Sequence, residues 1–208
     1  TLQWVQSIYV YDDSETVPEN PQAFTLSTDD NILVLMDTSI IRYSEAGEFI
    51  SSVEFNHSLS AIKRLDVGGY LVVGTETPNL VVTKLDANLN QEWQQTYLVG
   101  DALIPNGIIT LDDAYFISGL LNNNSWIFKL DFNGNLIWEN RFEDSVTEKI
   151  KTIKATTDNH IIAVGQSSSD VWALKLNTDG TIVWETTLGG NGADEGHDIN
   201  ENIDGNYT

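Results

Sequence analysis

Residues 127–138 read IFKLDFNGNLIW: a strand-like run, a short polar turn, and a second strand-like run that ends in tryptophan. Related stretches recur as VTKLDANLNQEW at 82–93 and ALKLNTDGTIVW at 173–184, with a weaker copy, IIRYSEAGEFIS, at 40–51. Three landmark residue types, two inside the clear copies and a glycine that precedes each copy, recur at spacings of 45 and 46 positions. Landmarks that keep one register indicate a true internal repeat. They are Trp93, Trp138 and Trp184; Lys84, Lys129 and Lys175; and Gly74, Gly119 and Gly165.

Each repeat reads as four short strands. In the last complete repeat we expect them near 150–155, 160–165, 171–176 and 182–188, with Asn, Asp and Gly in the turns between them. The strands are rich in β-branched and aromatic residues, and no helical period of apolar residues is found. Four strands in about 45 residues is the size of one β-propeller blade. We therefore predict an all-β fold, a β-propeller of four-stranded blades that forms an incomplete segment of a larger ring.

The repeat also divides the chain into parts of a single propeller segment. Residues 1–10 carry Trp4 at the position of the repeated tryptophan, so we expect them to form the outer strand of a preceding or closing blade. The predicted blades cover residues 23–54, 58–97, 105–142 and 149–188, and residues 196–208 begin a further blade.

The composition is strongly acidic, with 31 Asp and Glu against 10 Lys and Arg and a net charge of −21. Nucleic-acid binding needs clustered cations that neutralise phosphates. Four of the ten cations (Arg42, Lys84, Lys129 and Lys175) stand instead at one repeat position, so we expect no nucleic-acid partner. The acidity favours solubility in a salty or extracellular medium, with binding of Ca²⁺ or a cationic partner as the alternative.

Two further classes of feature are missing from the sequence. There is no cysteine, so the segment has neither a disulfide framework nor a thiolate metal site. No apolar run of about 18 residues predicts a transmembrane segment in this chain.

The segments KLDFNGNLIW and KLNTDGTIVW resemble the tryptophan-docking repeat of PQQ-like β-propellers, among them quinoprotein alcohol dehydrogenases and the bacterial outer-membrane assembly lipoprotein. Asp131, Gly134 and Trp138 match that pattern. The connection GGNGADE at 189–195 looks most like the long repeats of Bacteroidota-type surface and secreted lipoproteins. The resemblance implies a propeller in an extracytoplasmic place, either anchored at the cell surface or outer membrane or secreted. The same repeat serves enzymes, scaffolds and receptors.

All six tryptophans fall on repeat positions. A residue that recurs once per blade is expected to wedge between blades, burying a large apolar surface, rather than to stack on a sugar or quinone. The predicted inter-blade residues are Trp4, Trp93, Trp126, Trp138, Trp172 and Trp184.

Cofactor binding is not expected from these residues. The turn from Asp131 to Gly134 offers oxygens that suit Ca²⁺, but too few of them, so we predict a structural turn and no metal ligands, with Ca²⁺ left open as a cofactor. PQQ is disfavoured because the vicinal cysteine pair that often lies over the quinone in the resembling enzymes is absent.

One face of the propeller is the candidate for ligand binding. The connections from a fourth strand to the next first strand share that face with the loops Thr75–Asn79, Asn122–Ser125 and Gln166–Asp170. We predict no catalytic residue there, since adjacent carboxylates such as Asp194 and Glu195 point apart. The residues predicted for this face are His57, Asp101, Asn106, Glu148, Asp194, Glu195, His197 and Asp198.

These observations favour a non-enzymatic binding or scaffolding propeller of a secreted or cell-surface bacterial protein. It would contact a protein or glycan, other outer-membrane proteins included, through the loops of one face. The alternative is an enzyme, quinone-dependent or acting on polysaccharide, whose catalytic residues lie partly in blades outside this chain.

Overall fold

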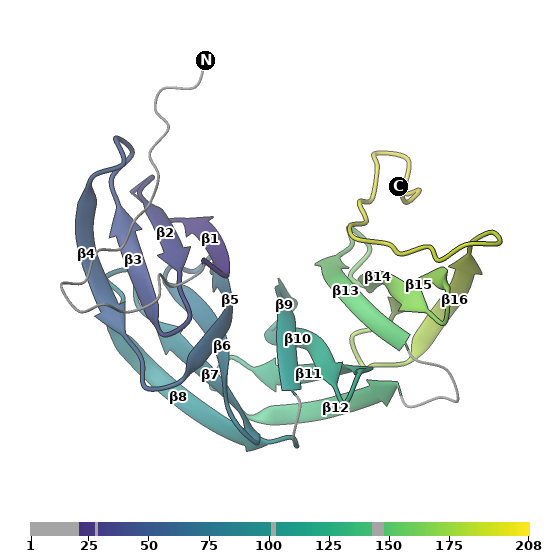
Figure 1. The fold of residues 1–208 in the computed structure, drawn as a ribbon, viewed down its shortest axis with the longest axis horizontal. Helices are drawn as coiled ribbons and strands as arrows, with labels where there is room; N and C mark the ends of the chain where they lie inside the picture. The colour runs from purple at the N-terminus through teal and green to yellow at the C-terminus, as the bar shows by residue number, and fades with distance from the viewer. Residues whose placement is uncertain (1–20, 28, 101–102, 143–147) are drawn as a thin grey trace. The chain divides into compact units, whose positions relative to one another are not determined.

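The computed structural model describes residues 21–27, 29–100, 103–142 and 148–208, and it contains four antiparallel sheets of four strands each (Figure 1). In every sheet the strands follow one another in chain order. No helix occurs among the described residues. The prediction of an all-β fold built of four-stranded blades is confirmed.

The four sheets divide the sixteen strands in order along the chain. The first contains β1 (Ala23–Leu26), β2 (Ile32–Leu35), β3 (Ser39–Tyr43) and β4 (Phe49–Glu54). The second contains β5 (Ser58–Arg64), β6 (Tyr70–Glu76), β7 (Asn79–Leu85) and β8 (Gln91–Leu98). The third contains β9 (Leu103–Leu111), β10 (Ala114–Leu121), β11 (Asn124–Asp131) and β12 (Leu136–Phe142). The fourth contains β13 (Glu148–Ala155), β14 (Ile161–Ser167), β15 (Asp170–Leu176) and β16 (Ile182–Leu188).

Three predictions concern residues outside those described. They are the outer strand at residues 1–10, the inter-blade role of Trp4, and the place of Asp101 on the binding face.

The chain divides into two compact units. Unit 1 comprises residues 1–76 and 82–94, and within it β1 and β2 pack against β5. Unit 2 comprises residues 77–81 and 95–208, and within it β9, β10 and β11 pack against β13.

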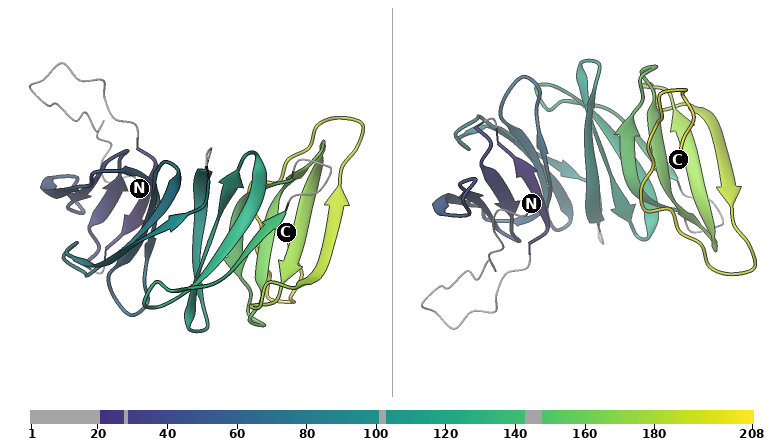
Figure 2. Two further views of the ribbon diagram at one scale, coloured as in Figure 1. Left: turned by 90° about the horizontal axis from the view of Figure 1, so that it is seen from below. Right: turned by 90° about the horizontal axis from the view of Figure 1, so that it is seen from above.

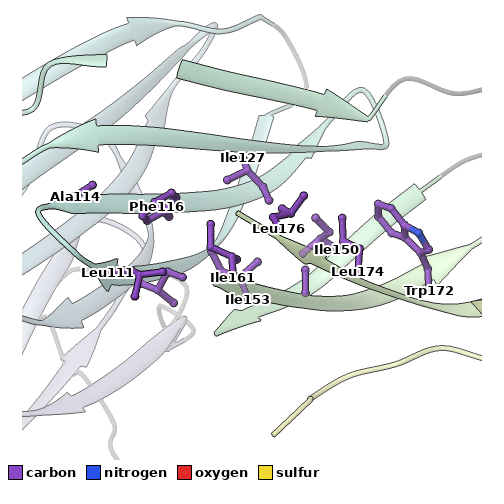
Figure 3. Packing of buried hydrophobic residues seen from close by; sticks show 12 residues of the cluster. Leu111, Ala114, Phe116, Ile127, Ile150, Ile153, Ile161, Trp172, Leu174 and Leu176 are labelled. Atoms are coloured by element: carbon purple, nitrogen blue, oxygen red, sulfur yellow. The ribbon is translucent and has the colours of Figure 1, made fainter. Parts of the chain in front are cut away.

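The core of unit 2 lies between the third and fourth sheets, where apolar side chains of both meet (Figure 3). Their burial removes large apolar areas from water and holds the two sheets together. The third sheet contributes Ile109, Leu111, Ala114, Phe116 and Ile127, and the fourth contributes Ile150, Ile153, Ile161, Ala163, Trp172, Leu174 and Leu176.

Unit 1 has a similar core between its two sheets. The first sheet contributes Leu33, Leu35 and Ile40, and the second contributes Leu59, Tyr70, Val72, Leu85 and Leu89.

A glycine paired with a tryptophan of the next strand recurs inside the sheets of unit 2. Gly119 on β10 is paired with Trp126 on β11, and Gly165 on β14 with Trp172 on β15. A Cβ atom added at Gly119 would lie 2.5 Å from the carbonyl oxygen of Ile104 and 3.0 Å from Trp126 Cζ2. A side chain there has no room, which explains why glycine recurs at this position of the repeat.

Trp138 connects the third sheet to the turn that joins β15 and β16. Its indole Nε1 donates to the carbonyl oxygen of Thr178 at 3.2 Å, and its ring meets Phe116 edge-on at 5.9 Å between centroids. Lys129 Nζ donates to the same carbonyl at 2.7 Å. The repeated lysine and tryptophan of one sheet thus hold a turn of the next.

The turn of the opening stretch is held by its own aspartate. Asp131 Oδ1 accepts the backbone N–H groups of Asn133 (2.9 Å) and Asn135 (2.8 Å), and Oδ2 accepts the Asn135 amide (2.7 Å). These hydrogen bonds, that of the Asn135 side chain first, hold the pKa of Asp131 below its usual range. With the carboxylate occupied this way, the turn is built as an Asx turn.

The corresponding turn of the second sheet shows that the motif tolerates the loss of its glycine. Leu89 stands where the third sheet has Gly134, and both adopt positive φ, 68° and 81° respectively. A leucine in that region costs about 1 kcal/mol. Asp86 supports it with the same three hydrogen bonds that Asp131 makes.

The C-terminal residues cover the other face of the fourth sheet, the face turned away from the third (Figure 2). Asn200 and Thr208 exchange two backbone hydrogen bonds of 2.8 and 2.9 Å around a turn. Ile199 is buried against that face, and the ring of Tyr207 lies 5.8 Å from the ring of Trp184.

We predict that Trp138→Ala lowers the free energy of unfolding by about 3 kcal/mol, because it removes a half-buried ring and a hydrogen bond that links two sheets. Chemical denaturation followed by circular dichroism measures the change. The matched control is Ile137→Ala, since Ile137 is the next residue on β12 and is 52% exposed. Equal denaturation midpoints for the two variants would refute the role given to Trp138.

A charged pair braces the turn between β13 and β14. Lys175 is buried, and its Nζ lies 2.6 Å from Asp158 Oδ2, while Thr156 Oγ1 donates to Asp158 Oδ1 at 2.6 Å. The hydrogen bond from Lys175, and then that from Thr156, hold the pKa of Asp158 well below its usual range. Burial alone lowers the pKa of Lys175, but hydrogen bonds to Asp158 and Tyr207 outweigh it and leave that pKa raised.

Because the folded pKa of Asp158 is depressed, its contribution to stability is fully present above the unfolded value, about 3.9, and is lost as pH falls below it. Because the Asp158 side chain is 52% exposed, solvent screening reduces this contribution. Asp158→Asn should therefore cost about 1 kcal/mol of unfolding free energy at neutral pH, and the difference from wild type should shrink below about pH 4. Asp113→Asn, an exposed residue in the equivalent turn of the third sheet, serves as control. A wild-type/Asp158→Asn difference that does not change between pH 7 and pH 3 would contradict the assignment.

Candidate functional site

His57, in unit 1, is part of the packing between β4 and β6. It is buried, its ring meets Phe55 edge-on at 5.7 Å, and its Nδ1 lies 3.1 Å from Asn56 Oδ1. Burial lowers the pKa of the imidazole, and the nearby Glu76 carboxylate offsets only part of the effect. The imidazole is therefore neutral near pH 7 and covered by its neighbours.

Asn106, on β9 of unit 2, uses both ends of its amide within the fold. Its Nδ2 donates to the carbonyl oxygen of Ile150 at 2.7 Å, and its Oδ1 accepts from Ser118 Oγ at 2.8 Å. In the predicted loop 122–125, Ser125 Oγ similarly donates to the carbonyl of Glu148 at 2.8 Å. Both side chains tie the third sheet to β13.

The connection after β16 carries four of the predicted residues, and two of them pair with lysines of β13. Glu195 pairs with Lys151 at 2.8 Å, and Asp198 pairs with Lys154 at 2.5 Å. The hydrogen bond from each lysine is the main cause that lowers the pKa of its carboxylate partner. Water and salt screen exposed ion pairs of this kind, so they position the connection more than they stabilise the fold.

Asp194 and His197 complete that connection. The backbone N–H of Asp194 donates to the carbonyl of Ser169 at 2.7 Å, and its Oδ2 accepts the N–H of Gly190 at 3.0 Å. The side chain of His197 is 76% exposed, with Nε2 3.4 Å from Glu195 Oε2. The connection therefore runs beside the 168–169 loop between β14 and β15.

Glu148, the first residue of β13, opens onto a cleft of about 290 Å³. The strand register brings its walls together: Glu148 is paired with Ser167, Trp172 with Thr187, and residues that are directly paired across strands project to one face. The cleft is lined by Glu148, Ser167, Trp172, Glu185, Thr186 and Thr187.

Chemically the cleft is rich in hydrogen-bond acceptors. It combines the carboxylates of Glu148 and Glu185 with the hydroxyls of Ser167 and Thr187, and Trp172 Nε1 lies 3.4 Å from Glu185 Oε2, close enough to orient that carboxylate. No group of three or more His, Asp or Glu suited to a metal occurs among the described residues. Such a lining favours a group that donates hydrogen bonds or carries positive charge.

Sequence reasoning selected Glu148 and the loop containing Ser167 but missed the wall formed by β16. The missing residues, Glu185, Thr186 and Thr187, lie on a strand that was regarded only as a carrier of the repeated tryptophan. A position-by-position comparison of the repeats could have found them, because Thr187 stands where the preceding repeat has Arg141.

Within the described ranges, no helix is long and apolar enough to cross a membrane.

The chain was compared with known proteins by sequence and by structure. No protein-family model matches the chain, and no curated protein matches it in sequence. Three solved structures are similar. The WD40 domain of Neurospora crassa Pan2 has 12% identity and a TM-score of 0.59, covering 84% of this chain and 54% of that one. A chain of the nidogen–laminin complex has 17% identity and a TM-score of 0.55, with coverages of 82% and 65%. BamB from Moraxella catarrhalis has 16% identity and a TM-score of 0.50, with coverages of 79% and 60%.

The similar structures are β-propellers, and at these identities the likeness concerns the fold alone. The chain spans between about half and two thirds of the length of these three solved chains. The four-stranded sheets and these neighbours together confirm the predicted fold: the chain is built of β-propeller blades.

Proposed function

We propose that this chain is a non-enzymatic platform that binds a protein partner through the loop edge at Glu148, in a secreted or surface-anchored bacterial protein. The observation that carries the proposal is the acceptor-rich cleft of about 290 Å³ at that edge. Its walls are the ends of paired strands on a buried core, so a partner would meet side chains that are already held in place. Little ordering cost then opposes binding.

A protein partner suits the cleft better than a glycan does. Sugar binding commonly uses an exposed aromatic ring face, whereas Trp172, the tryptophan of the cleft, is only 2% exposed. One of the similar structures is a complex of nidogen with laminin, so a propeller of this kind is seen with a protein partner.

The same proposal includes the type of repeat and the kind of protein to which it belongs. The stretch KLDFNGNLIW supports a tryptophan-docking repeat of the PQQ-like type, and the likeness to BamB agrees with it. The connection GGNGADE supports a surface or secreted lipoprotein of Bacteroidota type, and the net charge of −21 suits an extracellular medium.

The test is capture from a Bacteroidota cell-envelope extract by immobilised chain, followed by quantitative mass spectrometry. Wild type should retain a specific protein, Ser169→Trp should lose it because the bulky ring covers the loop edge, and Asn133→Trp in the turn between β11 and β12 should keep it. Equal retention by all three proteins would count against this edge as the binding site.

The enzyme alternative is tested separately by calorimetric titration with PQQ and Ca²⁺. We expect no saturable heat for PQQ with or without Ca²⁺. Tight stoichiometric binding would replace the platform by a quinone-dependent enzyme.

A further inference from the structure

The third sheet carries different side chains at the strand positions that line the cleft in the fourth sheet. Trp126 and Trp172 hold equivalent places, each paired with a glycine, so the strand register relates the third and fourth sheets residue by residue. The equivalent pairs are Leu103 and Glu148, Leu121 and Ser167, Glu139 and Glu185, and Arg141 and Thr187.

In the third sheet a guanidinium occupies this place. Arg141 Nη2 and Nε each lie 3.2 Å from Glu139 Oε1, and Nη2 reaches the carbonyl oxygen of Val99 at 3.4 Å. Leu121, beside it, is 5% exposed. The third sheet therefore carries at this place an exposed arginine that is paired with a glutamate of the same strand.

In the fourth sheet the glutamate remains while the arginine is gone. Thr187 replaces the long cationic side chain, Ser167 replaces the leucine, and about 290 Å³ stays open between Glu148 and Glu185. No cation is found among the described residues that line the cleft.

Ser167 adds a second, independent indication of a ligand. It lines the cleft and is only 8% exposed, yet its hydroxyl has no hydrogen-bond partner in the described part of the chain. The hydroxyl keeps access to the cleft, so a ligand held there can form a hydrogen bond with it.

We propose that the cleft accepts the guanidinium of an arginine side chain supplied by the protein partner. The inference rests on the proposed function for the existence of that partner. Glu185, which lies beside the Trp172 N–H, takes the part that Glu139 plays toward Arg141, and Glu148 and Ser167 offer further acceptors. Arginine suits the cleft better than lysine because its planar fork of donors can reach several acceptors at once.

The test is an NMR titration with the blocked peptide acetyl-Gly-Gly-Arg-Gly-Gly-amide and its citrulline counterpart, which keeps the shape and loses the charge. The readout is the indole N–H signal of Trp172, assigned by its disappearance in Trp172→Phe. The arginine peptide should shift this signal saturably and the citrulline peptide should not.

Two variants sharpen the result. Glu185→Gln, nearly isosteric, should weaken binding of the arginine peptide at least about tenfold. Thr187→Arg should abolish it, because the new guanidinium can pair with Glu185 as Arg141 pairs with Glu139 in the third sheet. Glu139→Gln makes the same charge change at the equivalent position and should leave the affinity unchanged.

Equal shifts by both peptides, or unchanged binding in Thr187→Arg, would overturn the proposal, as would saturation of the Trp172 signal by CaCl₂ alone. The capture from the cell-envelope extract tests the binding platform separately from the arginine-binding cleft. A partner retained equally by wild type and Thr187→Arg would leave the platform standing and remove the arginine, whereas no retained partner would remove the platform.

Discussion

The structure of unit 2 depends on the close packing around the glycine that recurs on the second strand of its sheets, Gly119 and Gly165. The space left by the missing Cβ at Gly119 admits the ring of Trp126, which becomes fully buried. A ring held there cannot shift by one residue without turning toward the other face, so the contact fixes the pairing of all four strands. The turns, the repeated lysine and the inter-sheet core keep their places because this register is kept.

A fixed register also allows one position to change its use from sheet to sheet. The strand positions occupied by Glu139 and Glu185 are equivalent, and in the third sheet the carboxylate pairs with Arg141 of the same strand. Replacing that arginine by Thr187 does not disturb the strand, because β16 keeps its pairing with β15. The fold can thus acquire an open acceptor site by shortening a few side chains, without a new loop or a new element.

Much of the fold could be predicted because its signals are local. Turns such as Asp131 to Asn135 are decided by an aspartate that bonds its own backbone, and this chemistry is visible in a short stretch of sequence. The site was harder, because its walls come from strands far apart in the chain. Glu148 lies on β13 and Thr187 on β16, so two strands stand between them in the sheet, and the pairing of β15 with β16 includes a register shift beside Lys175. Asn106 illustrates the same limit, since its partner is a carbonyl on β13, 44 positions away.

Several of the few cations of the chain form bonds within the fold, and this affects the electrostatic field around the molecule. Arg42 donates to the carbonyl of Ala87, Lys129 to that of Thr178, and Lys175 pairs with Asp158, so these repeated cations serve the fold. With 31 acidic residues against 10 Lys and Arg, the negative potential around the molecule is left largely uncompensated. Such a field raises the encounter rate with a basic partner and is screened by salt. Attraction at long range and a cleft rich in acceptors at short range select for the same chemistry, a partner that presents arginine.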